Sequence, residues 1–202
     1  RKSRCDPMTQ IKLMPQKLAN QIAAGEVVGR PASVVKELVE NSVDAGATEI
    51  KISIEKSGSQ YIKVEDNGTG ISKSDMKLSL QRHATSKIYS VEDLYGINSM
   101  GFRGEALASI ASIARVRITS QQMKSPDCWS LYVEGGDEVS FGPHPTIQGT
   151  KVEVIDLFYN TPARKRFLRK DSTEWSYIDD LIKKLALAHS HVSMTLIKDG
   201  KK

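Results

Sequence analysis

The chain has 202 residues and a formal net charge of +5, from 29 Lys and Arg against 24 Asp and Glu. Hydrophobic residues make up 39% and charged residues 26% of it, ordinary globular values that exclude a wholly disordered chain and predict one domain, or one with a small appendage. Cys5 and Cys128 lack metal-ligand spacing, which argues against a zinc site or a disulfide-built scaffold. Because no run approaches the ~20 apolar residues of a membrane span and no secretory leader is visible, we expect a soluble, intracellular protein with no membrane partner.

The order of helix and strand signals along the chain predicts the fold class. The chain opens on Arg1, and Met8 is a plausible natural start, so we expect residues 1–7 to be an upstream or non-native remnant and residues 8–202 to be the folded unit. The predicted elements are helices over 14–24 (ended by Gly25), 31–45, 75–82, 105–114 and 174–189, and strands over 50–56, 61–66, 115–120, 129–134, 150–155 and 192–197. Helices and antiparallel hairpins are mixed along the chain without a regular βαβ alternation. This order predicts an α+β fold: a mixed, mostly antiparallel sheet with helices on one face.

The helix that begins at Pro31 has two contrasting faces. At 100° per residue, one side carries Val34, Val35, Leu38, Val39 and Val43, and the other carries Glu37, Glu40, Asn41 and Asp44. The polar side is typical of a solvated helix face. Three clustered carboxylates with only Lys36 nearby also repel one another, and a bound Mg²⁺, which prefers oxygen ligands, would relieve that repulsion. Both interpretations remain open from this pattern.

Two glycine-containing loops are the other chemical signals. Residues 66–70 read Asp-Asn-Gly-Thr-Gly directly after a predicted strand, and residues 101–104 read Gly-Phe-Arg-Gly before a predicted helix. Each fits an ordinary turn or connection, and each also fits a loop whose backbone approaches a phosphate at a helix N-terminus. Neither a Walker-type G-x-x-x-x-G-K-[ST] loop nor a G-x-G-x-x-G after a strand is present, which excludes P-loop and Rossmann interpretations.

The motifs taken in order resemble the GHKL ATPase superfamily, which includes DNA gyrase B, the ninety-kilodalton heat-shock chaperone, sensor histidine kinases and the MutL mismatch-repair proteins. The residues within these motifs are most similar to those of the ATPase region of the MutL family, in its bacterial form. The segments that carry the resemblance are NQIAAGEVVGRPASVVKELVENSVDAGAT, DNGTGI, RHATSKI, GFRGEALASI, GT and DLFYNTPARKRFL. It covers the chain from Ile11 to about Gly200.

The resemblance implies a Bergerat ATP-binding fold and a role for each matching residue. Glu37 would be the general base that activates water, Asn41 the Mg²⁺ ligand, and Asp66 the acceptor for the adenine amine. Glu40 and Asp44 would either support these residues without touching the ligand or have a structural role. Residues 84–105 would form a lid over ATP. The remaining nucleotide-binding residues implied are Gly68, Gly70, Thr85, Ser86, Lys87, Gly101, Phe102, Arg103, Gly104 and Thr150.

The family also implies partners. The basic residues Arg164, Lys165, Arg166 and Arg169 fit either a solvated surface or, as in MutL, contact with DNA without sequence preference. The resemblance further implies an ATP-dependent homodimer, the mismatch-recognition protein MutS, and a downstream nuclease or helicase. It implies the cytoplasm of a bacterium, or the nucleus if the source is eukaryotic.

Three functional hypotheses follow. The first is an ATP-binding and ATP-hydrolysing domain of a mismatch-repair protein, whose lid closes and which dimerises with nucleotide. We expect the isolated chain to turn over little ATP, since the family's transducer subdomain, with its phosphate-binding lysine, and its C-terminal dimerisation domain have no match here. The second is a nucleotide-gated DNA-binding scaffold with negligible hydrolysis, and the third is another GHKL enzyme.

Overall fold

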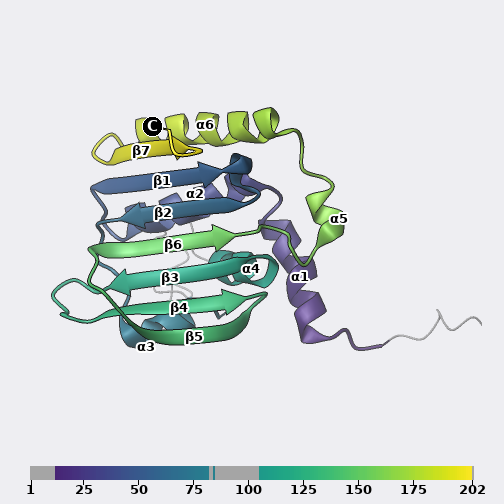
Figure 1. Cartoon of the computed structure of the whole chain (residues 1–202), viewed down its shortest axis with the longest axis horizontal. Helices are drawn as coiled ribbons and strands as arrows, with labels where there is room; N and C mark the ends of the chain where they lie inside the picture. Colours follow the sequence, from purple (N-terminus) through teal and green to yellow (C-terminus); the bar gives the residue numbers. More distant parts are fainter. Residues whose placement is uncertain (1–11, 82–83, 85–104, 202) are drawn as a thin grey trace, which may run out of the picture.

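The computed structural model of the chain describes residues 12–81, 84 and 105–201, which form one mixed sheet with helices packed against it (Figure 1). The helices are α1 (Gln16–Val27), α2 (Pro31–Asp44), the 3-10 turn η2 (Lys56–Gly58), α3 (Lys73–Leu78), α4 (Ala106–Ile113), α5 (Pro162–Lys165) and α6 (Asp171–Ala188). The strands are β1 (Glu49–Glu55), β2 (Tyr61–Asp66), β3 (Arg115–Gln121), β4 (Cys128–Glu134), β5 (Asp137–His144), β6 (Gly149–Ile155) and β7 (Ser193–Lys198). None of these helices is both long and apolar enough to cross a membrane.

The seven strands run in the spatial order β5-β4-β3-β6-β2-β1-β7. All neighbours pair antiparallel except β1 and β7, which are parallel. Ile52 lies opposite Val64, and Val64 in turn lies opposite Val152, so apolar side chains of successive strands share one face. This mixed, mostly antiparallel sheet confirms the predicted fold class.

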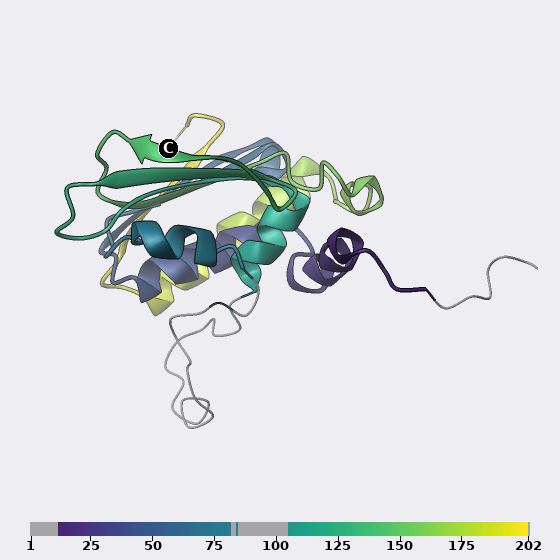
Figure 2. The same cartoon turned by 90° about the horizontal axis from the view of Figure 1, so that it is seen from below.

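One face of the sheet is covered and the other is open. Figure 2 shows α2, α3, α4 and α6 together on the same side of the sheet. The core lies in that layer: Val35 and Val39 of α2 and Ile178 of α6 are fully buried there with Ile52 and Ile62 of the strands. Burial of such side chains stabilises the fold by about 1.5–3 kcal/mol each, before chain entropy is subtracted.

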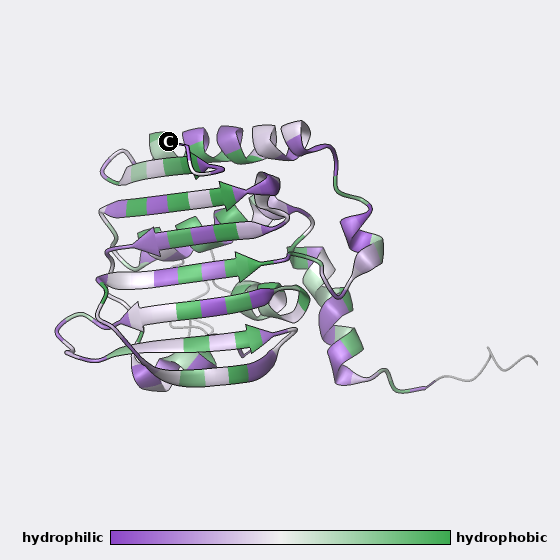
Figure 3. Ribbon diagram, viewed as in Figure 1, coloured by the Kyte–Doolittle hydropathy of each residue, from purple (hydrophilic) through white to green (hydrophobic). Residues whose placement is uncertain are grey.

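The open face carries the more polar residues of the alternation in β1 and β2, which Figure 3 shows. Cross-strand and same-strand polar contacts occupy it. Tyr61 donates to Glu153 across β2 and β6 at 2.6 Å, and Lys63 pairs with Glu65 at 2.9 Å. Each of these partly exposed pairs adds little stability. Together they make this face polar, as suits a sheet face that no described helix covers.

The structure differs from the sequence predictions at several element bounds and contains two elements that were not predicted. Helix α1 does not end at Gly25 but continues to Val27, because the buried Val28 anchors the next turn and its N–H donates to Ala24. Helix α3 begins earlier than predicted, where Ser72 caps it by accepting from Asp75 N. Strand β5 and helix α5 were not predicted; β5 contains Gly142 and Pro143, which are tolerated because it is an edge strand.

Candidate functional site

The residues of the Asp-Asn-Gly-Thr-Gly motif form a turn between the end of β2 and the end of α2. Thr69 N donates to the carbonyl of Ala45, just after the last residue of α2, at 3.0 Å. Gly68 makes this approach possible, since a Cβ there would stand 2.8 Å from Ala45 O. Asn67 fixes the turn from the other side by accepting from the N–H groups of Thr48 and Glu49 at 2.8 and 2.9 Å. The motif therefore joins α2 and β2 rigidly.

The carboxylate of Asp66 lies in this junction and makes three hydrogen bonds. Ser42 Oγ donates to its Oδ2 at 2.7 Å, while the N–H groups of Gly68 and Thr150 donate to its Oδ1 at 2.9 and 3.3 Å. Burial raises the pKa of Asp66 above its usual value, and the three hydrogen bonds oppose that rise. The result is a fixed, half-buried acceptor group.

Thr150 stands opposite Asp66 on β6 and belongs to a second polar cluster. Its Oγ1 is 2.8 Å from the Oγ of Ser120 on β3, which also lies 3.2 Å from the carbonyl of Gly149. Gly149 has φ +70°, and a Cβ there would stand 2.2 Å from Asp66 O, so only glycine lets β6 come this close to β2. Asp66 and Thr150 are thereby brought together from residues 84 positions apart.

Gly70 closes the turn against the end of β3. Its φ is +72°, and a Cβ there would stand 2.0 Å from the carbonyl oxygen of Gln121. Next to it, Ile71 N donates to Ser120 Oγ at 2.8 Å and Met123 N donates to Thr69 O at 2.7 Å. Gly68 and Gly149 thus let backbone approach Asp66 closely, and Gly70 lets the same turn approach the end of β3; we call this arrangement the Asp66 cradle.

Glu37 and Asn41 lie one turn apart on α2, about 6 Å along its axis. Glu37 is half-buried and Asn41 is exposed, so both residues keep part of their surface accessible. The predicted acidic face is divided, however, because Glu40 is only 3% exposed and accepts from Lys36 at 2.8 Å. This ion pair supports a structural role for Glu40, while Asp44 is exposed at the helix end.

A magnesium ion fits this donor set only together with a phosphate ligand. Among the residues described, no group of three His, Cys, Asp or Glu side chains is arranged to hold a metal by itself. Mg²⁺ commonly keeps several waters and binds through one or two protein groups plus substrate phosphates. The amide oxygen of Asn41 is suited to supply one such group.

Seven of the predicted nucleotide-binding residues lie outside the part of the chain that the structure describes. They are Thr85, Ser86, Lys87, Gly101, Phe102, Arg103 and Gly104. Glu105, which follows them, is the N-cap residue of α4.

Sequence reasoning missed Ser42 and Ser120, the two hydroxyls behind Asp66 and Thr150. Ser42 is 4% exposed and Ser120 1% exposed. A signal was present: Ser42 continues the buried face of α2 after Leu38 and Val39, and Ser120 continues the buried alternation of β3 after Ile118. A polar residue at a core position requires a partner, and these two find theirs at the site.

The four residues predicted to contact DNA differ in their exposure and in their contacts within the protein. Lys165, Arg166 and Arg169 are exposed on or next to α5. Arg164 instead reaches back to α1, where its guanidinium donates to Ile22 O at 3.2 Å and covers Gly25, whose Cβ would stand 1.4 Å from Arg164 Cζ. Arg164 therefore differs from the other three basic residues, because its side chain ties α5 to α1.

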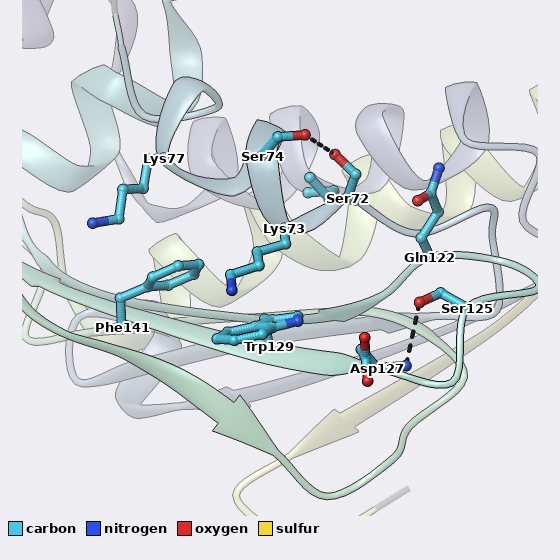
Figure 4. A pocket seen from close by; sticks show the side chains of 10 residues that line it. Ser72, Lys73, Ser74, Lys77, Gln122, Ser125, Asp127, Trp129 and Phe141 are labelled. Atoms are coloured by element: carbon cyan, nitrogen blue, oxygen red, sulfur yellow. Dashed lines mark hydrogen bonds between the residues drawn. The ribbon is translucent and has the colours of Figure 1, made fainter.

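A groove of about 560 Å³ lies between α3 and strands β4 and β5 (Figure 4). Trp129 and Phe141 stack along it with ring centroids 5.3 Å apart, and Lys73 Nζ lies 3.7 Å from the Trp129 centroid. None of the predicted site residues lines it. It begins at Ile71, directly after the glycine turn, so it adjoins the Asp66 cradle without being part of it.

Comparison with known proteins identifies the family to which the chain belongs. The family model of histidine kinase-, DNA gyrase B- and HSP90-like ATPases matches residues 30–161. This range contains Glu37, Asn41, Asp66, Gly70 and Thr150. The chain therefore belongs to the family of histidine kinase-, DNA gyrase B- and HSP90-like ATPases.

Within that family, the chain is similar to the DNA mismatch repair protein MutL. It is 56% identical over 192 residues to MutL of Vibrio vulnificus strain YJ016 and to MutL of Shigella boydii serotype 4 strain Sb227, covering 95% of this chain in each case. It spans only 29% and 31% of the lengths of those relatives. The solved ATPase domain of Aquifex aeolicus MutL in complex with ADP aligns with a TM-score of 0.69 at 35% identity, over 87% of this chain and 62% of that one.

Proposed function

We propose that this chain binds ATP with its adenine on Asp66 and hydrolyses it with the aid of Mg²⁺. The single observation that carries the proposal is the cradle at Asp66: a fixed carboxylate, oriented by three donors and enclosed by glycine backbone, beside the exposed polar face of α2. A fixed carboxylate accepts a hydrogen bond from the exocyclic amine of adenine and repels the carbonyl oxygen that guanine presents at the same position.

The residues of α2 supply the chemistry in this proposal. Glu37 would accept the proton of the water that attacks the γ-phosphate and hold that water in line. Asn41 would hold Mg²⁺, which when bound neutralises charge on the phosphates. Their one-turn separation lets both side chains reach the same ligand from one helix face. Thr150 would complete the base pocket, and residues 84–105 would cover the phosphates.

The similarity to MutL supports a setting for this activity. The ATPase would act in DNA mismatch repair, with nucleotide closing the lid and driving homodimerisation. The partners in this proposal are MutS, a downstream nuclease or helicase, and DNA, in the bacterial cytoplasm. In the whole protein, nucleotide state would then coordinate the repair partners.

DNA binding is a second candidate function, favoured by the surface around α5. Lys165, Arg166 and Arg169 are exposed there, and Phe167 between them is 83% exposed. Cations with an exposed aromatic ring fit a nucleic-acid backbone and its bases. In this alternative the chain is a nucleotide-gated DNA-binding scaffold with negligible hydrolysis.

Calorimetric titration with ADP, in the presence and absence of Mg²⁺, tests the proposed nucleotide and metal site. We expect binding that Mg²⁺ strengthens in the parent chain. In Asn41→Ala, binding should persist and its dependence on Mg²⁺ should be lost, because the side chain that holds the ion is gone. Asp180→Ala, at an exposed position of α6, is the control and should behave like the parent. Absence of ADP binding by the parent chain would refute the proposal.

A further inference from the structure

Ser42 occupies a position on α2 where an apolar residue would be expected. Its side chain is buried, and its Oγ lies 2.7 Å from Asp66 Oδ2 and 3.1 Å from the carbonyl of Leu38 one turn earlier. A hydroxyl has one proton to donate. The bond to Asp66 is the shorter of the two, and a bond to a charged acceptor is the stronger kind.

Among the residues that the structure describes, the hydrogen bonds of Asp66 leave one acceptor direction of its carboxylate unfilled. A carboxylate has about four lone-pair sites, two on each oxygen. Gly68 and Thr150 fill those of Oδ1, and Ser42 fills one of the two on Oδ2. Since the group is planar and held at both oxygens, the remaining site points in a fixed direction. A single N–H donor can be accepted there.

From this arrangement we propose that Ser42 is a specificity-determining positioning residue, whose hydroxyl orients the Asp66 carboxylate as an acceptor that selects adenine over guanine. The inference rests on the proposed function, because it assumes that Asp66 meets the base. Ser42 itself touches no nucleotide and acts through Asp66.

Loss of the Ser42 hydroxyl changes what Asp66 can recognise. Burial already raises the pKa of Asp66, and the Ser42 bond is the first of three hydrogen bonds that counter it. Without that bond the carboxyl holds a proton more readily and has one oxygen unrestrained. A neutral carboxyl carries an O–H that donates to the carbonyl of guanine, so discrimination between the bases decreases.

The experiment compares ADP and GDP affinities of Ser42→Ala with those of the parent chain, by calorimetry. We expect roughly tenfold weaker ADP binding, the cost of one charge-assisted hydrogen bond, and unchanged or tighter GDP binding. Ser42→Thr keeps the hydroxyl and should restore most of the ADP preference. Ser57→Ala is the matched control, because Ser57 is also buried but donates to the carbonyl of Asp171, the first residue of α6, at 2.8 Å. This variant should retain both affinities.

The outcomes separate this inference from the proposed function. If Ser42→Ala keeps the parent ADP to GDP ratio, either with both affinities unchanged or with both reduced equally, the specificity role is wrong and Ser42 is merely structural. The melting temperature of each variant shows whether it folds. If Ser42→Ala does not fold, Ser42→Thr is tested instead, and the inference requires that it fold and keep the parent ratio of ADP to GDP affinity. If Asp66→Asn binds ADP as tightly as the parent, the proposed base site itself fails.

Discussion

Asp66 and Thr150 occupy the same register position on the neighbouring strands β2 and β6, and the N–H of Thr150 donates to Asp66 Oδ1 at 3.3 Å. The contact exists because Gly149 allows the two backbones to approach closely. A carboxylate in this position is held by the sheet itself and by α2, since Ser42 donates to its other oxygen. The proposed base site is therefore held by rigid elements, so single substitutions can test it.

Asp66→Asn should preserve folding while removing base recognition. The asparagine carbonyl accepts from Gly68 N and Thr150 N, and its amide donates to Ser42 Oγ, whose own proton then goes to Leu38 O. The amide presents donors where adenine needs an acceptor, so ADP affinity should fall by about tenfold or more. Calorimetry measures the loss, and a parent-like affinity would contradict the assignment.

The difference in stability between the parent chain and the same variant should depend on pH. The pKa of Asp66 is raised above 3.8 in the folded state, so folding favours its protonated form. Its contribution to stability is fully present below the unfolded pKa and is lost as pH rises through the folded pKa. Asp66→Asn has no such titration and should gain melting temperature relative to the parent as pH rises through that window. A relative loss at neutral pH would show that the assumed amide bonding does not form.

Glu37→Ala should separate binding from hydrolysis. Removal of a general base commonly costs about 10²–10⁴-fold in rate, whereas Asp66 and Thr150, which hold the base in our proposal, remain unchanged. We expect parent-like ATP affinity with turnover reduced to that extent, measured by phosphate release from the full-length protein. Glu26→Ala, on α1, is a control that removes a carboxylate elsewhere. Equal turnover in Glu37→Ala and the parent would refute the role of Glu37.

Gly70→Ala and Gly46→Ala form a matched pair with the same φ of +72°. At Gly46 a Cβ meets no atom within 4 Å, so alanine should cost only about 1–2 kcal/mol of backbone strain. At Gly70 the Cβ would stand 2.0 Å from the backbone oxygen of Gln121, so strands must separate and the cost should be about 3 kcal/mol or more. Urea unfolding of both variants measures the difference. Equal costs would mean that the turn next to Asp66 yields easily.

Charge reversal on α5 tests the DNA surface. Lys165→Glu and Arg166→Glu should weaken binding to duplex DNA and lower the slope of log affinity against log salt by about one for each phosphate that the side chain no longer neutralises. Arg164→Ala should affect DNA less, because this guanidinium is bonded to α1. Lys184→Glu, exposed on α6, makes the same charge change and is the control. If all four variants bind alike, α5 is a solvated surface.

Much of the fold could be predicted because local patterns set it. Pro31 and the apolar spacing to Val43 predict α2, and alternation at Ile50, Ile52 and Ile54 predicts β1. Strand β5 was missed because it lies at an edge, where burial imposes no strong alternation: most of its residues are exposed. Its existence depends on hydrogen bonds to β4, which no local pattern encodes.

The candidate site divides in the same way. By itself the sequence determined the elements, the motif order that resembles the MutL ATPase region, and the residue types at Glu37, Asn41 and Asp66. Only the tertiary structure decided that Ser42 holds Asp66, that Ser120 contacts Thr150, and that Arg164 is bonded to α1. The physical reason is that helix and strand periods depend on neighbours a few residues apart, whereas these hydrogen bonds join residues 24, 30 and 142 positions apart. Such residues meet only when the elements that carry them have packed.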